Sequence, residues 1–571
     1  MRCARLVGIA ISLIAAGTLT AQVQADGVVS SKNGMVITTS GIASDAGASI
    51  LGKGGNAVDA AVATAFALAV THPSAGNIGG GGFMVYRPAR GDAMTVDYRE
   101  KAPLKSTVTM YLDSSGKINR RLTATGYLAP GVPGTVRGMA TAHKQWGKLP
   151  WKDLVMPAVT LAEKGFPLSA ALARSLNREV DSSMKSYPAS VAAYGKPGGG
   201  KWNAGDTIVL KDLGRTLRAI AEQGPDAFYT GWIADSIAAT MRENHGLISK
   251  EDLAQYQAKM RAPIRGTYRG FELITMPPPS SGGVTMIEML NILEQFDLPK
   301  LGALSPDALH LEIEAMRRGY LDRARFLGDP DFVQMPLDKL TSKAYAKTLA
   351  ASIDKTRASS SVELGKDIVT QIASTNEEEE ETTQFSIVDR DGNAVSNTYT
   401  LEGGFGSHVV VRGAGFILNN EMGDFNKKPG ETNTRGDIGT PANLIAPGKR
   451  MLSSMSPTIV TKNGELFIVT GSPGGRTIIN TVMEIVLNAI DFGMDARAAV
   501  STPRFHHQWL PDTVTFERNA LPDSSTKRLQ AMGHAVKFGA VQGDGHTIII
   551  KNGVPTGAND RRSPDSRVGL P

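Results

Sequence analysis

Residues 377–393, EEEEETTQFSIVDRDGN, run from five consecutive glutamates directly into a stretch that alternates like a β-strand. Like charges repel one another, so residues 377–381 are expected to be extended and exposed to solvent. The simplest interpretation is a solvated loop that leads into an edge strand. The alternative is a cleavage point between Glu381 and Thr382, after which the strand would begin with a free amino group.

The residues after Thr382 predict a β-hairpin. Residues 385–388 and 394–400 have strand character, and the turn-forming DRDGN of residues 389–393 separates them. A second hairpin is predicted where residues 546–551 meet Asn552-Gly553.

The part of the chain before Thr382 is richer in helical patterns. Asn56 is placed to cap an Ala-rich helix, and Met286, Leu290 and Leu293 recur on one helical face after a Pro-rich loop. Another helix is predicted at residues 478–491, between strands. Together these patterns favour a layered α+β fold, and no linker or repeat divides the chain.

The first 25 residues predict a secretory signal peptide. Arg2 and Arg5 precede an apolar run at residues 6–19, and small residues at 23–25 suit a signal peptidase. No later segment has the apolar length of a membrane span, so we expect an exported protein without stable membrane insertion, periplasmic or secreted. Cys3 is the one cysteine, so the mature chain can have neither a disulfide nor a cysteine nucleophile.

Composition argues against several other functions. The formal net charge of +6 includes Arg2 and Arg5, and the remaining basic residues are dispersed, so a nucleic-acid partner is not expected. The glycine clusters at residues 79–82 and 474–475 fit neither of two phosphate-binding motifs, the P-loop G-x-x-x-x-G-K-[ST] and the dinucleotide-binding G-x-G-x-x-G. His506 and His507 are adjacent and would point to opposite faces of a strand, so no metal site is expected.

Thr382 has a chemical reason to become N-terminal. A threonine hydroxyl is a weak nucleophile that needs a base within hydrogen-bond reach. A free α-amine has a pKa of about 7.7 to 8 and would supply that base on the same residue. Attack of the Thr382 hydroxyl on the Glu381 carbonyl would convert the peptide bond into an ester, and hydrolysis of the ester would free the amine.

Ordered sequence blocks along the whole mature chain resemble the γ-glutamyltranspeptidases, which are N-terminal nucleophile (Ntn) hydrolases. The blocks in the second part are residues 382–383 (TT), 391–395 (DGNAV), 398–400 (TYT), 418–425 (LNNEMGDF), 452–460 (LSSMSPTIV), 470–475 (TGSPGG) and 503–510 (PRFHHQWL). Those in the first part are residues 56–61 (NAVDAA), 79–83 (GGGGF), 97–103 (DYREKAP) and 278–283 (PPSSGG).

The resemblance implies a four-layer αββα sandwich made of two intertwined pieces. A precursor would cleave itself into a large subunit, residues 26–381, and a small catalytic subunit, residues 382–571. The two subunits would form a heterodimer that is one globular unit.

The resemblance also assigns site residues. Thr382 matches the nucleophile, Thr400 the threonine that hydrogen-bonds it, and Gly474 and Gly475 the loop whose N–H groups bind the oxyanion. For the γ-glutamyl head, Arg99, Ser453 and Ser454 match the carboxylate-binding groups, and Asp424, Glu421 and Glu402 match the groups near the ammonium. Without the resemblance, Arg99 would be read as a surface ion pair, Thr400 as a strand residue, and the serines and glycines as turns.

Three positions depart from the family pattern. Glu402 stands where some members have asparagine, and Gln384 replaces a histidine. Residues 428–447 are long enough for the lid that covers the pocket in part of the family, but Arg435 lies where a lid tyrosine often stands.

The expected reaction is a two-step acyl transfer without cofactor or metal. The γ-glutamyl group of glutathione would form an ester with Thr382 and pass to water, an amino acid or a peptide. Three alternatives stay open: a glutaryl-type β-lactam acylase of the same family, an enzyme that processes poly-γ-glutamate, and an exported binding protein that is never cleaved.

Overall fold

The structure of the protein is a computed structural model that describes residues 22–23, 28–373 and 382–571. The five glutamates and most of the predicted signal peptide lie outside these residues. Gln22–Val23, inside that predicted peptide, form the short strand β1. Within the described ranges, no helix combines the length and apolar character needed to cross a membrane.

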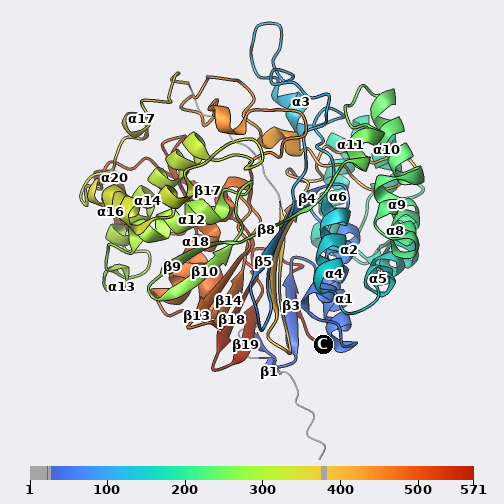
Figure 1. The fold of residues 1–571 in the computed structure, drawn as a ribbon, viewed down its shortest axis with the longest axis horizontal. Helices are drawn as coiled ribbons and strands as arrows, with labels where there is room; N and C mark the ends of the chain where they lie inside the picture. The colour runs from blue at the N-terminus through green and yellow to red at the C-terminus, as the bar shows by residue number, and fades with distance from the viewer. Residues whose placement is uncertain (1–21, 24–27, 374–381) are drawn as a thin grey trace, which may run out of the picture.

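Two antiparallel sheets form the two central layers of the molecule (Figure 1). The first has the order β20 (Arg567–Gly569), β3 (Gly34–Thr38), β11 (Thr383–Asp389), β12 (Ala394–Thr400), β4 (Gly81–Arg87), β5 (Met94–Tyr98), β8 (Lys259–Arg261). The second has the order β1, β2 (Val28–Ser30), β19 (Val554–Ala558), β18 (Thr547–Lys551), β14 (Glu465–Thr470), β13 (Thr458–Lys462), β10 (Phe271–Thr275), β9 (Ile264–Tyr268).

A layer of helices covers the outer face of each sheet (Figure 1). On the first sheet lie α1 (Gly41–Gly52), α2 (Ala57–Thr71), α4 (Thr135–Trp146), α5 (Trp151–Lys164), α6 (Ala170–Asp181), α8 (Lys211–Gln223) and α10 (Gly231–Glu243). On the second lie α12 (Gly282–Leu293), α14 (Pro306–Phe326), α16 (Lys343–Ala351), α18 (Ile478–Ile490) and α20 (Asp523–Ala531). The predicted four-layer αββα sandwich is confirmed.

Shorter elements connect these layers. The helices are α3 (Arg120–Ala124), α7 (Pro188–Tyr194), α9 (Asp226–Tyr229), α11 (Lys250–Ala254), α13 (Leu298–Leu301), α15 (Leu337–Leu340), α17 (Ser361–Leu364), α19 (Ala496–Ser501) and the 3₁₀ turns η1 (Ser183–Ser186), η2 (Glu421–Asp424), η3 (Pro441–Asn443), η4 (Gly475–Thr477). The strands are β6 (Phe166–Pro167), β7 (Thr207–Ile208), β15 (Phe505–His506), β16 (Val514–Glu517) and β17 (Val536–Gly539).

The predicted hairpin after Thr382 is confirmed as β11 and β12, whose register pairs Thr383 with Tyr399. The carboxylate of Asp389 accepts hydrogen bonds from the backbone N–H groups of Asp391 and Asn393, which fixes the turn. This side-chain-to-backbone bonding is the usual reason that aspartate favours turns. The hairpin of β18 and β19 across Asn552-Gly553 is also confirmed.

The predicted helix after Asn56 is confirmed as α2. Asn56 and Asp59 form a capping box, because each side chain accepts a hydrogen bond from the backbone of the other. Every residue of α2 is buried. A helix that is apolar all round belongs in a core, which explains the Ala-rich run. The helices predicted after the Pro-rich loop and near residue 478 are α12 and α18.

Strands from both sides of the predicted cleavage point build each sheet. In the first sheet, β11 and β12 lie between β3 and β4, so residues after Thr382 form its centre. Neither predicted subunit could keep this sheet intact alone. The subunit boundary itself remains a prediction.

Candidate active site

Thr382 immediately precedes β11 and lies opposite Thr400 at the end of β12, because the adjacent pair in the ladder is Thr383 with Tyr399. Thr382 is 7% exposed and lines two cavities, a small one of about 20 Å³ and a large one of about 650 Å³. The two threonines that the sequence analysis linked are therefore neighbours in the structure.

The backbone around Thr400 is closely packed. The Thr400 hydroxyl accepts a hydrogen bond from the Glu402 N–H at 2.8 Å. Gly80, in the glycine cluster before β4, approaches the Thr400 carbonyl so closely that a Cβ atom there would lie 2.1 Å from the oxygen. The Gly79–Gly82 run therefore lets strands and loop meet beside the nucleophile, where a larger side chain would push the backbone apart.

Gly474 and Gly475 each line a cavity that Thr382 also lines. Gly474 lines the large cavity and Gly475 the small one. Both adopt positive φ, 126° and 52°, which glycine tolerates at no steric cost. Gly475 begins η4, which continues into α18. The backbone N–H groups and dipole of a helix start favour negative charge, as an oxyanion site requires.

The small cavity brings together nearly all of the predicted site residues. Its lining is Thr382, Thr400, Glu402, Glu421, Asp424, Ser453, Ser454, Met455, Gly475, Arg476 and Ile478. The volume has room for about one water molecule, so a larger ligand requires side chains to move.

Arg99 lies behind this cavity, fully buried at the end of β5. Its guanidinium pairs with Glu421 on one side and with Asp424 on the other, and Glu100 lies 3.7 Å away. Burial alone would lower the pKa of Arg99, but the carboxylates of Glu421 and Asp424 outweigh burial and raise it. Arg99 therefore stays charged at this depth.

One arginine cannot fully compensate three carboxyl groups. Burial raises the pKa of Glu100 to about 7, although Arg99 opposes the shift. Burial also raises the pKa of Glu421 well above its ordinary value, and Arg99 again opposes it. The site thus holds a carboxyl group, that of Glu100, that can take up or release a proton near neutral pH.

Ser453 and Ser454 are positioned by the Pro-rich loop before α12. The Ser453 N–H donates to the Pro279 carbonyl at 2.9 Å, and Ser281 N–H and hydroxyl both donate to the Ser453 carbonyl. The predicted hydroxyl pair is thus held by a segment about 170 residues earlier in the chain.

Gln384 does not reach the cavity. Its fully buried side chain lies between the two sheets, where its amide donates to the Ser396 hydroxyl at 3.1 Å and its oxygen accepts from Thr398. Gln384 thus has a packing and hydrogen-bonding role in the sandwich interior.

The predicted lid segment lies beside Asp424. Lys428, Glu431 and Asp437 line a cavity that also contains Asp424. Arg435 does not line either cavity at Thr382, and its guanidinium pairs with Asp437 at 3.3 Å.

Residues 370–373, the last ones described before Thr382, are bonded to this lid segment. Thr370 N–H donates to the Thr432 carbonyl at 2.8 Å, and Thr434 N–H donates to the Gln371 carbonyl at 3.2 Å. Thr434 hydroxyl also donates to the Ala373 carbonyl. The end of the predicted large subunit and the lid therefore form one short parallel ladder in the uncut chain.

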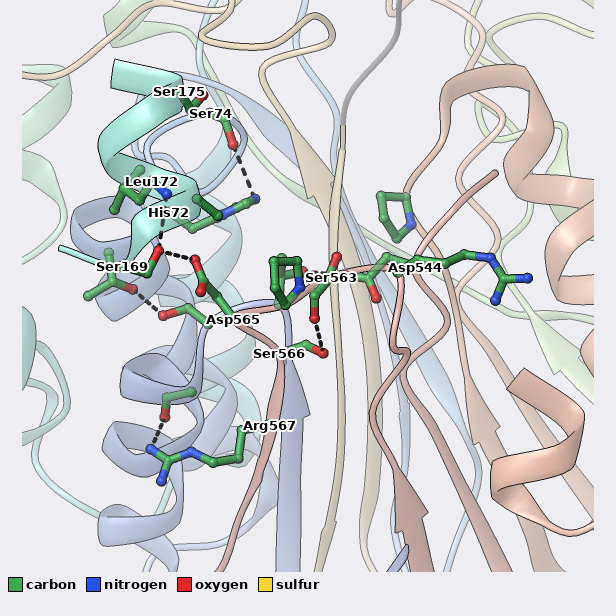
Figure 2. Close-up of a pocket in the computed structure, with 18 of the residues that line it drawn as sticks. His72, Ser74, Ser169, Leu172, Ser175, Asp544, Ser563, Asp565, Ser566 and Arg567 are labelled. Carbon is green, nitrogen blue, oxygen red and sulfur yellow. Dashed lines mark hydrogen bonds between the residues drawn. The ribbon is translucent and has the colours of Figure 1, made fainter. Parts of the chain in front are cut away.

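The large cavity opens on the other side of Thr382, between α6 and the C-terminal segment (Figure 2). Hydroxyl groups dominate this wall, and Ser169 donates to the Asp565 carboxylate at 2.6 Å. His72 and Ser74 bond to each other at 3.2 Å on the same side. At about 650 Å³ this cavity is far larger than the small cavity of about 20 Å³ that Thr382 also lines.

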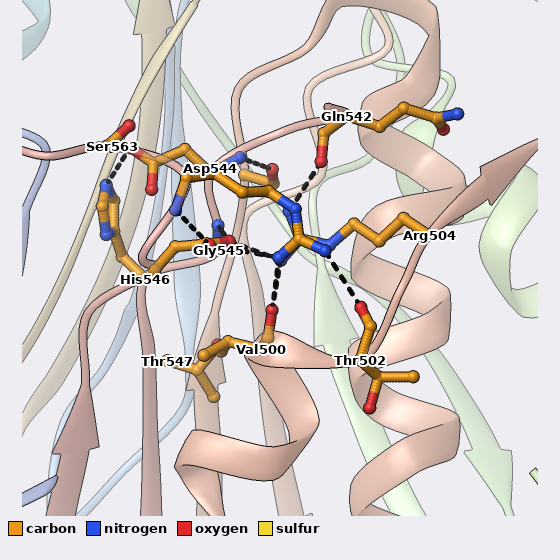
Figure 3. Close-up of polar contacts among 12 residues, drawn as sticks. Val500, Thr502, Arg504, Gln542, Asp544, Gly545, His546, Thr547 and Ser563 are labelled. Atoms are coloured by element: carbon orange, nitrogen blue, oxygen red, sulfur yellow. Dashed lines mark hydrogen bonds and ion pairs between the residues drawn. The ribbon is translucent and has the colours of Figure 1, made fainter. Parts of the chain in front are cut away.

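A buried polar cluster supports the start of β11 from the large-cavity side. The Thr39 hydroxyl lies 3.2 Å from the Thr383 hydroxyl, 3.1 Å from Asp544 and 3.0 Å from His546 Nε2. Asp544 and His546 lie on the loop that Arg504 holds, because Arg504 donates to the Gln542 carbonyl at 2.6 Å (Figure 3). The residue next to the nucleophile is thus fixed through side chains from both ends of the chain.

One group of described residues has the composition of a metal site, namely His310, Glu314 and His534. The two imidazoles bond to each other at 2.8 Å, and Glu314 is already paired with Arg317 and Arg318. Two guanidinium groups beside the carboxylate would repel a divalent cation.

Sequence reasoning missed Glu100, Arg323 and Arg476. Glu100 follows Arg99, and Arg476 follows the two oxyanion glycines, so adjacency to a motif could have identified both. Arg323 lies on α14 and reaches the Ser454 hydroxyl at 3.1 Å. No local pattern marks it, because α14 carries many charged residues.

Comparisons with known proteins agree with this geometry. The family model described as Gamma-glutamyltranspeptidase matches residues 43–570. The glutathione hydrolase proenzyme of Escherichia coli (strain K12) is 47% identical over 538 residues, covering 94% of this chain and 92% of that protein. The acylase ACY 1 proenzyme of Pseudomonas sp. (strain SE83) is 37% identical over 549 residues, covering 95% and 94%.

A solved structure supports the same assignment. The cephalosporin acylase from Bacillus halodurans superposes with a TM-score of 0.82 at 28% identity, covering 98% of this chain and 99% of that one. The family model and the relatives span nearly the whole chain. The chain therefore belongs to the γ-glutamyltranspeptidase family.

Proposed function

We propose that this protein cleaves the γ-glutamyl amide of glutathione and related compounds after cutting its own chain between Glu381 and Thr382. One observation carries the proposal: Thr382, the start of a central strand, lines one cavity together with Thr400, Gly475, Asp424 and the Ser453-Ser454 pair. A nucleophile, an oxyanion loop and charged recognition groups are thus within reach of one ligand.

Maturation would begin with the Thr382 hydroxyl. Its oxygen attacks the carbonyl carbon of Glu381, the bond from that carbon to the Thr382 nitrogen breaks, and an ester forms. Water then hydrolyses the ester, which leaves a carboxylate on Glu381 and a free amine and hydroxyl on Thr382. The new carboxyl end would follow five consecutive glutamates, whose like charges repel one another.

Catalysis would then proceed in two steps. The Thr382 amine takes the proton of its own hydroxyl, and the oxygen attacks the γ-carbonyl of the donor while the N–H groups of Gly474 and Gly475 bind the oxyanion. The leaving amine departs with a proton and a γ-glutamyl ester remains on Thr382. Water releases glutamate from this ester, or the amine of an amino acid or peptide accepts the group.

The charges near Thr382 suit the two charged groups of the γ-glutamyl head. Arg99 offers a planar guanidinium to the α-carboxylate, and Asp424 with Glu421 and Glu402 offers carboxyl groups to the α-ammonium. Arg99 and Asp424 are paired with each other in the structure. The substrate carries both charges and would replace this pair with two new ones.

The acylase relative supplies a second candidate activity, attack on a glutaryl amide that lacks the α-ammonium. Asp424 favours the glutamyl donor, because a glutaryl group offers no cation to this carboxylate. Rates on γ-glutamyl-p-nitroanilide and glutaryl-p-nitroanilide separate the two candidates.

The predicted export, periplasmic or secreted, is part of the same proposal and rests on the N-terminal sequence pattern. The first measurement is the intact mass of the denatured, purified protein. We expect two species that fit residues 26–381 and 382–571, together with release of p-nitroaniline from the γ-glutamyl donor. A single uncut chain in folded material without this activity would contradict the proposal and favour a binding protein.

A further inference from the structure

The hydroxyl groups of Ser453 and Ser454 are arranged as a pair of donors. The Ser453 oxygen accepts a hydrogen bond from the Met455 N–H at 3.1 Å, and the Ser454 oxygen accepts one from Arg323 Nη2 at 3.1 Å. Within the described part of the chain, neither hydroxyl donates to another protein group. A hydroxyl that already accepts a hydrogen bond still has its hydrogen to donate, here toward the cavity that both residues line.

Arg323 fixes this arrangement from behind. It comes from the last turn of α14, and its Nε donates to the Ser281 hydroxyl at 2.8 Å. Ser281 passes the contact on, because its hydroxyl donates to the Ser453 carbonyl at 2.6 Å. One planar guanidinium thus contacts Ser454 directly, through Nη2, and Ser453 indirectly, through Nε and Ser281. The guanidinium plane fixes the distance between these two nitrogens, which the single ammonium group of lysine cannot do.

Arg323 does not line the small cavity itself. It lines the neighbouring cavity with Asp424 and Leu452. Its guanidinium donates to the hydroxyls of Ser281 and Ser454, whereas the guanidinium of Arg99 is paired with the carboxylates of Glu421 and Asp424. The hydrogen bond from Arg323 therefore places a guanidinium group directly on the Ser454 hydroxyl.

We propose that Arg323 is a positioning residue for recognition of the substrate α-carboxylate. It orients and polarises the Ser454 hydroxyl, and through Ser281 it holds Ser453, so that both serines present their hydrogens to one carboxylate. The inference rests on the proposed γ-glutamyl function and adds to it that carboxylate specificity depends on a residue outside the cavity.

The test uses three p-nitroanilides that differ only in the charged groups of the acyl chain. The γ-glutamyl compound has a carboxylate and an ammonium, the glutaryl compound has only the carboxylate, and the 4-aminobutyryl compound has only the ammonium. Each rate is divided by the concentration of cleaved enzyme, measured by intact mass, so that incomplete maturation does not affect the result.

We expect Arg323→Gln to lower kcat/KM about tenfold for the γ-glutamyl and glutaryl compounds, because a hydrogen bond to a charged group loses its orientation. The 4-aminobutyryl rate should change less than about twofold, because that compound has no carboxylate to recognise. Arg323→Lys keeps the positive charge but loses the planar, two-nitrogen geometry of the guanidinium. Its kcat/KM for the γ-glutamyl and glutaryl compounds should lie between those of the wild type and Arg323→Gln.

A double-mutant cycle tests whether Arg323 acts through Ser454. If it does, Arg323→Gln should have little further effect in a Ser454→Ala background, because residues in one hydrogen-bond network are not additive. Arg325→Gln is the matched control, since it removes the same charge from the same helix and its guanidinium pairs with Asp367 away from the site. It should leave the ratio of the three rates unchanged.

Equal losses on all three compounds, or full additivity in the cycle, would overturn the proposal and leave Arg323 with a general structural role. Should Arg323→Gln fail to mature, Arg323→Lys with the same three compounds decides the question. Failure of the proposed function is distinguishable, because the wild-type protein itself would then not cleave the γ-glutamyl compound.

Discussion

The two ends of the small cavity differ in the charge of their residues and in the segments that supply them. At the reacting end, Thr382, Thr400 and Gly475 are neutral, and the β11–β12 ladder and the start of α18 position them. At the recognition end, Arg99, Glu421 and Asp424 are charged and come from separate segments. The difference teaches that the chemistry depends on backbone placement, whereas the choice of substrate depends on buried charges that hold each other in place.

Removal of the proposed nucleophile should have the largest effect. It should abolish self-cleavage and catalysis at the reacting end and leave the substrate-binding residues of the recognition end in place. Thr382→Ala has no hydroxyl to attack Glu381 or a donor, so we expect an uncut chain and a loss of activity of about 10⁴-fold or more. Intact mass and p-nitroaniline release check both results. Thr382→Ser keeps a hydroxyl and should still be cut, and a processed, active Thr382→Ala protein would disprove the assignment.

Removal of the arginine should disable the recognition end. Arg99→Gln leaves the buried carboxyl groups of Glu100 and Glu421 without their cation, so we expect kcat/KM for the γ-glutamyl donor to fall by about 10²-fold or more and the Tm to fall as well. Arg435→Gln on the lid is the comparison variant and should change kcat/KM less than about threefold. Equal effects of the two variants would mean that Arg99 has no special role.

The contribution of the acidic residue Asp424 to substrate recognition can be measured separately from that of Arg99. Asp424→Asn removes the partner of the substrate ammonium, so kcat/KM for γ-glutamyl-p-nitroanilide should fall by about tenfold to a hundredfold. The rate on the glutaryl compound, which lacks the ammonium, should be maintained or rise. A parallel loss on both compounds would place Asp424 in a purely structural role.

The smallest effect concerns pH. Burial raises the pKa of Glu100 to about 7, so this carboxyl group is partly neutral below pH 7 and ionises as the pH rises. Ionisation adds negative charge near the substrate ammonium, so KM for the γ-glutamyl donor should fall about threefold between pH 6 and pH 8. Glu100→Gln should flatten this dependence, and an unchanged profile in that variant would exclude Glu100 as its source.

Much of the fold and part of the site could be predicted from local patterns. The turn at Asp389 and the cap at Asn56 are encoded within a few residues, because each side chain bonds to backbone close by in sequence. Thr382 could be identified because a charged run ends at a strand. The match to the family's sequence blocks then predicted the other site residues, although it did not predict which of them contact each other.

Other features depend on contacts that no local pattern encodes. Gln384 is close to the nucleophile in sequence, but strand alternation points its side chain into the sandwich interior. Arg323 reaches Ser454 across 131 residues, and the lid meets residues 370–373 only through the fold.

The sequence by itself determined the hairpin and the capped core helix, since these depend on turn chemistry and periodicity. Through the resemblance it also predicted Thr382 as the nucleophile. Only the tertiary structure decided which charges meet. Arg99 contacts Glu421 and Asp424 across more than 300 residues, and the pKa of Glu421 is raised because the fold buries this carboxyl group. Burial and pairing of charges are properties of the assembled layers, because desolvation and Coulomb energy depend on distances in space, not on separation along the chain.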